Sequence, residues 1–165
     1  MFLRTLLVGS RDTIAGTVYG TIIVLSIVTA GAPAFEHGHW RLIAVLAVTV
    51  LVFWIAHVYA HIIGESLAEG HRLGREQILG IAQRELAIPL AAILPMAAVA
   101  LGALGVLGPG TSLWLAVGIG VTTLAVEGVR FARLEQLGAR GTIFSVAINL
   151  GLGLTLVVLK AAVSH

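Results

Sequence analysis

The chain has 165 residues, of which 58% are hydrophobic and only 11% are charged. Soluble domains usually carry roughly 25% charged residues, and the mean hydropathy of +1.03 is typical of lipid-embedded chains. These values exclude an ordinary soluble domain and predict an integral membrane protein. The absence of cysteine excludes disulfides, thiolate metal sites and thiol catalysis.

The basic residues do not form a nucleic-acid-binding patch. The formal net charge is +2, and the ten lysines and arginines are spread in twos and threes along the chain. Nucleic-acid-binding surfaces cluster such residues on one face, so we expect no nucleic-acid partner. A membrane span needs about 20 apolar residues, so a chain of this length has room for a single transmembrane domain over residues 1–165 and for no separate soluble domain.

Five long apolar segments predict five transmembrane helices, because a backbone in lipid must satisfy its own hydrogen bonds. We place the spans at residues 14–32, 42–64, 86–107, 112–128 and 142–162. In the first span, Gly16 and Gly20 form a small-residue face that favours close helix packing. In the third, Pro89 and Pro95 each remove a backbone hydrogen bond and predict a kink. The expected fold class is an all-α integral membrane protein with five transmembrane helices.

The arginines predict the orientation of these spans. Eight basic residues precede span one or lie between spans two and three or four and five: Arg4, Arg11, Arg72, Arg75, Arg84, Arg130, Arg133 and Arg140. The opposite side has Arg41 and, near the end of span five, Lys160. The positive-inside rule therefore places the N-terminus in the cytoplasm and the C-terminus outside. A secretory signal is disfavoured for the first segment, which exceeds the usual apolar core of about 7–15 residues.

A polar stripe in the second span is the main functional signal. His57, His61 and Glu65 are spaced four residues apart and share one helix face, with Glu69 one step further. An ionisable group at the bilayer centre costs about 2.5–3.5 kcal/mol, so it usually has a partner or a function. Imidazole and carboxylate groups together suit divalent transition metals better than Ca²⁺ or Mg²⁺. The stripe predicts a metal site.

Other interpretations of the stripe remain open. It also suits a proton relay, because histidine titrates near physiological pH, and the two histidines could simply hydrogen-bond to neighbouring helices. Elsewhere, the spacing of Glu127 and Arg130 predicts a local ion pair, and Glu85 is expected at the start of span three, where a carboxylate favours a helix N-terminus. No nucleophile-elbow, P-loop or H-E-x-x-H motif occurs, so we do not expect an enzyme.

Two segments resemble a known family. These segments are Arg11-Asp12-x-x-x-Gly16-x-x-Tyr19-Gly20 and Ala56-His57-x-x-Ala60-His61-x-x-Gly64-Glu65. They are similar to the first and second spans of the vacuolar iron transporter family, and the chain resembles a remote, shortened member of that family. Pro89 and Pro95 are similar to the proline-rich start of that family's third span. The resemblance implies a five-span homodimer that exports Fe²⁺ or Mn²⁺ from the cytoplasm, coupled to protons.

The same resemblance implies roles for individual residues. Tyr19, His57 and Glu65 fall where the family has its first-span acid, second-span polar ligand and methionine ligand, and Glu69 matches an acidic position that follows. The sequence departs from the family in having a tyrosine in place of the acid. It also has only a short segment between Glu65 and Arg84 in place of the family's cytoplasmic metal-collecting region.

We therefore expect a dimeric, multi-pass transporter, in a bacterial plasma membrane, that moves a divalent metal such as Fe²⁺, Mn²⁺ or Zn²⁺ out of the cytoplasm. The expected metal-binding residues are His57, His61, Glu65, Glu69 and Tyr19, with Glu69 at the entrance. The alternatives are a proton channel or proton-coupled protein without a metal, and a membrane scaffold subunit that transports nothing. In the scaffold, the glycines and polar residues would serve assembly.

Overall fold

The computed structural model describes the backbone of residues 11–31 and 38–163, and these ranges fold into helices joined by short turns, without a strand. The helices are α2 (Arg11–Gly31), α3 (His39–Glu69), α4 (Arg75–Arg84), α5 (Ala87–Ala103), α6 (Pro109–Leu134) and α7 (Ala139–Val163). Each of the five predicted spans falls on a helix, although the third is predicted at residues 86–107 and α5 ends at Ala103. Residue 32 of the first span and Arg4 lie outside the described residues.

Within the described residues, four helical stretches are long and apolar enough to cross a membrane. They are Thr13–Ala30, His39–Glu69, Arg75–Ala103 and Pro109–Leu134. The fifth predicted span lies within α7, a helix of 25 residues. These dimensions are compatible with a multi-pass integral membrane protein.

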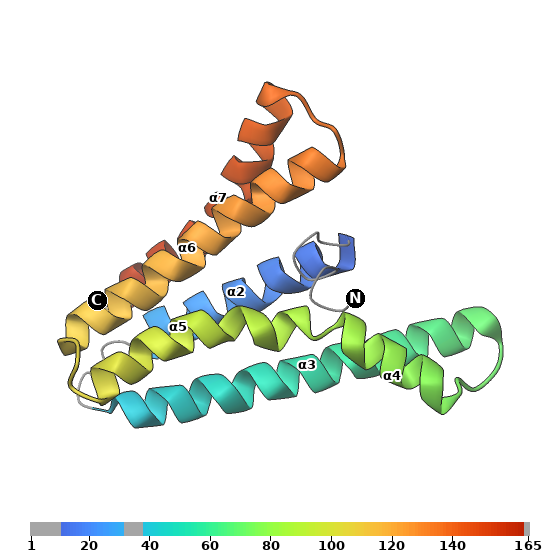
Figure 1. Ribbon diagram of the computed structural model, residues 1–165, viewed down its shortest axis with the longest axis horizontal. Helices are drawn as coiled ribbons and strands as arrows, with labels where there is room; N and C mark the ends of the chain where they lie inside the picture. Colours follow the sequence, from blue (N-terminus) through green and yellow to red (C-terminus); the bar gives the residue numbers. More distant parts are fainter. Residues whose placement is uncertain (1–10, 32–37, 164–165) are drawn as a thin grey trace.

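The helices pack into a bundle around α2 (Figure 1). Contacts join α2 to α5 and α6, α3 to α5, and α7 to α6. The core between them consists of aliphatic side chains that are almost fully enclosed, including Val24, Val28, Leu42, Leu46 and Val99. The α3–α4 and α6–α7 connections lie toward the end of the bundle where α2 begins, while α3 and α6 start at the other end (Figure 1).

The arginines follow this division of the bundle into two ends. The end with the α3–α4 and α6–α7 connections carries Arg72, Arg75, Arg84, Arg130, Arg133 and Arg140, whereas Arg41 lies near the start of α3 at the other end. The two predicted loops rich in arginine therefore share one end of the fold, as the positive-inside assignment requires.

The surface between these ends is strongly apolar. On α3, large aliphatic side chains remain exposed even at mid-helix, among them Val48 (61%), Leu51 (51%), Val52 (57%) and Ile55 (54%). Soluble monomers rarely expose contiguous apolar surface on this scale. A hydrocarbon environment accommodates it without cost.

The second predicted span is longer than residues 42–64. The observed helix α3 has 31 residues, which at about 1.5 Å per residue gives roughly 46 Å, against about 30 Å for a hydrocarbon core. Its last turns therefore extend past the other spans and form a hairpin with α4 (Figure 1). The helix ends at Gly70, whose φ of 69° is a left-handed conformation that glycine adopts readily.

A proline sets the break between α4 and α5. Pro89 has no N–H for the Glu85 carbonyl four residues earlier, and its ring crowds that carbonyl. The Glu85 oxygen accepts a hydrogen bond from the Ile88 N–H instead, at 3.1 Å. The kink predicted for this span is thus a helix break at residues 85 and 86, whereas α5 continues through Pro95.

Candidate metal site

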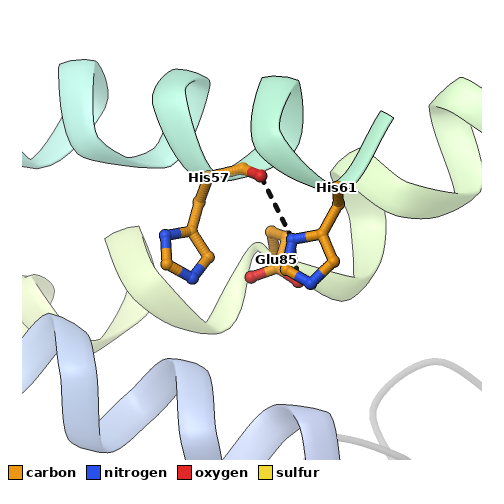
Figure 2. Close-up of side chains that lie close together, drawn as sticks. All are labelled: His57, His61 and Glu85. Atoms are coloured by element: carbon orange, nitrogen blue, oxygen red, sulfur yellow. Dashed lines mark hydrogen bonds and ion pairs between the residues drawn. The ribbon is translucent and has the colours of Figure 1, made fainter. Parts of the chain in front are cut away.

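His57 and His61 lie one helical turn apart on α3, on the side that faces the α4–α5 break. Their ring centroids are 5.5 Å apart, and Figure 2 shows both imidazoles extending from the same face of the helix. This confirms that the i, i+4 spacing brings the two rings together. His61 Nδ1 also lies 3.1 Å from the backbone oxygen of His57.

Glu85 supplies the carboxylate of this cluster. Its Oε1 lies 3.5 Å from His61 Nδ1, and its side chain is only 12% exposed, against 48% for His61. One ligand atom from each of His57, His61 and Glu85 lies within 4.8 Å of the others (Figure 2). The break at residues 85 and 86 places this carboxylate opposite α3. We call His57, His61 and Glu85 the candidate site.

Glu65 is not part of this cluster. Its Oε1 accepts a hydrogen bond from Arg84 Nη2 at 2.6 Å, which forms an ion pair between α3 and the end of α4. The Trp54 indole N–H, which donates to the Ala82 carbonyl at 3.3 Å, fixes the same helix pair. The structure therefore places Glu65 beside the residue that precedes Glu85, with its carboxylate on a guanidinium group.

Glu69 is the last residue of α3, next to the turn that leads to α4. Its Oε2 is 3.3 Å from His71 Nε2 and accepts a hydrogen bond from Gln77 Nε2 at the same distance. These groups are exposed. Glu69 is thus at the open end of the hairpin, outside the candidate site.

Tyr19 contacts the candidate site through its ring. The Tyr19 and His57 ring centroids are 4.8 Å apart with an interplanar angle of 36°. Tyr19 also meets the ring of Phe53, one turn before His57 on α3, edge to face at 6.1 Å. The structure thus brings Tyr19 to His57 in an aromatic contact between the two rings.

The cluster has the chemistry of a transition-metal site. Such ions bind imidazole nitrogen and carboxylate oxygen at about 2.0–2.2 Å, which in a tetrahedral shell leaves the ligand atoms about 3.3 Å apart. A bound metal would require the ligand atoms to move closer together than the observed spread of 4.8 Å. Because His61 is half exposed, its ring has room for this adjustment. Two imidazoles and one carboxylate also form a common ligand set of catalytic zinc.

Glu85 is the member of the site that the stripe on α3 did not indicate. The sequence interpretation placed Glu85 at a helix N-terminus and did not pair it with His61. In the structure Glu85 is instead the C-cap residue of α4, and α5 begins two residues later without an acidic residue in its first turn. The available signal was Pro89, whose effect on the carbonyl four residues earlier puts the break at Glu85.

Two further buried polar groups have structural partners. Glu127 on α6 is 3% exposed and accepts a hydrogen bond from Arg130 Nη1 at 2.5 Å, which confirms the predicted ion pair. At the other end of the bundle, His39 Nε2 lies 3.2 Å from the Ser112 hydroxyl. This contact links the starts of α3 and α6.

No family model, no curated protein and no solved structure matches the chain.

Proposed function

We propose that this protein is a multi-pass membrane transporter of a divalent transition metal, with His57, His61 and Glu85 as its binding site. The observation that carries the proposal is the convergence of two imidazoles and one carboxylate from two helices, with ligand atoms within 4.8 Å. Ionisable groups are rare in transmembrane segments and usually mark substrate or ion pathways.

The location of the site supports movement of the ion as well as binding. The cluster lies toward the arginine-rich end of the bundle, on the face of α3 that also carries Glu65 and, beyond it, Glu69. Carboxylates along this face attract cations to the imidazoles. We further propose that the arginine-rich end is cytoplasmic, that α7 is the fifth span, that the ion leaves the cytoplasm with proton coupling, and that two copies form the transporter, as in the vacuolar iron transporter family.

Metal binding by the purified protein in detergent is the first test. Calorimetry with Fe²⁺, Mn²⁺, Zn²⁺, Co²⁺ and Ni²⁺ should show one site per chain for at least one of these ions. Glu85→Gln and His61→Ala should each weaken that binding at least about tenfold, because even residues that only orient metal ligands contribute 10–100-fold to affinity. His71→Ala is the matched control, because His71 is an exposed histidine in the neighbouring turn. Equal affinities of Glu85→Gln and wild type would rule out the site.

Transport is tested separately in proteoliposomes that enclose a metal-sensitive dye. Flux of the bound metal should be lost with Glu85→Gln and retained with His71→Ala. A protein that binds metal at the site but shows no flux would be a metal-binding membrane protein without transport activity.

The contact between His61 and Glu85, at 3.5 Å, also favours a second candidate function. A histidine and a carboxylate at this distance can pass a proton between them. Such a protein would conduct protons in metal-free buffer, and Glu85→Gln would abolish that current. Proton conduction without any metal binding would replace the transporter proposal.

A further inference from the structure

We propose that Glu65 is a fourth metal ligand of the candidate site and that Arg84 competes with the metal for it. This inference rests on the proposed metal site and adds to it the residue that completes the coordination shell. Tetrahedral sites in proteins use four ligands, and the candidate site supplies three. The remaining ligand has to come from side chains next to the cluster or from water.

Glu65 is the carboxylate best placed to complete the shell. It follows His61 by one helical turn, and residues with this spacing are neighbours on one face, with β-carbons about 5–6 Å apart. It also lies beside the second helix of the site, because its carboxylate meets Arg84, the residue directly before Glu85. Glu65 thus lies on the helix that carries both histidines, and its carboxylate reaches the end of α4, next to Glu85.

The ion pair is weak enough for a bound cation to displace it. The side chains of Glu65 and Arg84 are 34% and 51% exposed, and they meet through one hydrogen bond, from Nη2 to Oε1. Exposed ion pairs of this kind contribute little to stability, because solvent screens them and two long side chains must be held in place. A divalent cation between His61 and Glu85 carries twice the charge of the guanidinium group. Rotation of the Glu65 side chain from Arg84 to that cation would release Arg84 into solvent.

The pairing also gives Arg84 a role. Its guanidinium group neutralises the charge of Glu65. A cation gains Glu65 as a fourth ligand only if it attracts the carboxylate more strongly than Arg84 does. A monovalent ion offers no more charge than Arg84 does, so the arrangement favours divalent ions. Arg84 is in this sense a residue that determines specificity without binding the metal itself.

The test is a double-mutant cycle of Co²⁺ affinity in the full-length protein in detergent. The proteins are wild type, Glu65→Gln, Arg84→Met and the double variant, with Arg75→Met as the control for the loss of a nearby positive charge. Visible absorption of the bound Co²⁺ reports the shell, because four-coordinate Co²⁺ absorbs more strongly than six-coordinate Co²⁺. Both substitutions lie on the surface, so the variants should fold.

We expect Glu65→Gln to weaken Co²⁺ binding about tenfold and to change the absorption spectrum. When Glu65 is present, Arg84→Met should strengthen Co²⁺ binding several-fold. In the Glu65→Gln background, Arg84→Met should strengthen Co²⁺ binding no more than Arg75→Met does. Equal strengthening in both backgrounds would show simple charge repulsion and overturn the proposal. So would an unchanged affinity for Glu65→Gln.

The two proposals fail in different ways. Co²⁺ binding that is lost with His61→Ala but unaffected by Glu65→Gln would remove Glu65 from the shell and leave the candidate site intact. If wild type bound none of the five metals, both proposals would be wrong.

Discussion

Gly20 of α2 and Ile88 of α5 pack backbone against backbone. A β-carbon built on Gly20 would lie 2.5 Å from the Ile88 carbonyl oxygen and 3.0 Å from its α-carbon. One turn earlier, a β-carbon on Gly16 would come within 3.0 Å of the Ala87 β-carbon. The small-residue face predicted for the first span thus sets the start of α5 against α2. Because Tyr19 precedes Gly20 and Glu85 lies just before α5, this contact also positions two parts of the candidate site.

Gly20→Ala should therefore destabilise the protein. Introducing a methyl group into a packed backbone contact costs about 1–3 kcal/mol, so thermal unfolding in detergent should shift to lower temperature. Gly118→Ala on α6 is the matched control, because no atom lies within 4 Å of its β-carbon position, and alanine at an open helical site changes stability by less than about 1 kcal/mol. If both variants unfolded at the same temperature, α2 and α5 would not pack as described.

Gly20→Ala should also weaken metal binding, through the position of Glu85. A shift of α5 away from α2 moves the helix break relative to His57 and His61. Calorimetry at a temperature where the variant is still folded would measure this effect, with Gly118→Ala again as the control. An affinity equal to that of wild type would indicate that the site depends on the α3–α4 hairpin alone.

Tyr19 could act as a metal ligand through its hydroxyl group or as a support for His57 through its ring, and two substitutions distinguish these roles. If the hydroxyl were a metal ligand, Tyr19→Phe would weaken binding as much as Tyr19→Ala. The ring contact at 4.8 Å instead predicts that Tyr19→Phe retains near-normal affinity, whereas Tyr19→Ala frees the imidazole and weakens binding several-fold. Isothermal calorimetry of the two variants side by side decides between these roles.

Much of this fold could be predicted because its determinants are local. The length of each apolar segment defines the spans. Gly16 and Gly20 indicate a close helix contact even when the partner helix is not known. The i, i+4 spacing brings the rings of His57 and His61 together for the same reason. The ends of the helices were less predictable, because α3 continues to Glu69 along its hairpin contact with α4.

The composition of the candidate site depended on contacts between helices, which spacing does not give. Glu65 belongs to the same stripe as the histidines, yet its carboxylate meets Arg84 from the next helix. Glu85 reaches His61 only because Pro89 interrupts the helix at residues 85 and 86. Which carboxylate faces the imidazoles is thus a property of the α4–α5 junction, and a pattern within α3 alone could not identify it.

Loss of Arg130 should destabilise the protein strongly. Glu127 has a side chain that is only 4% exposed, and its Oε2 finds no hydrogen-bond partner among the described residues. Arg130→Met would leave that carboxylate buried without the guanidinium, and breaking a buried ion pair in this way costs about 3–5 kcal/mol. Thermal unfolding of the purified variant would measure the loss.

The double variant Glu127→Gln with Arg130→Met is the control for this interpretation. It removes the buried charge together with its partner, so it should be more stable than Arg130→Met alone. If the double variant were no more stable, the arginine would act through packing of its aliphatic stem rather than through charge.

The distribution of arginines predicts the orientation in the membrane, and the absence of cysteine makes this directly testable. Glu76→Cys places a thiol on α4 at the arginine-rich end, and Thr111→Cys places one at the start of α6 at the other end; both positions are exposed. If the arginine-rich end is cytoplasmic, a membrane-impermeant maleimide should label Thr111→Cys in intact bacterial cells and should label Glu76→Cys only after the cells are opened. Wild type, which has no thiol, controls for background. The reverse labelling pattern would invert the topology and, with the site near the arginine-rich end, would make the candidate site open to the outside.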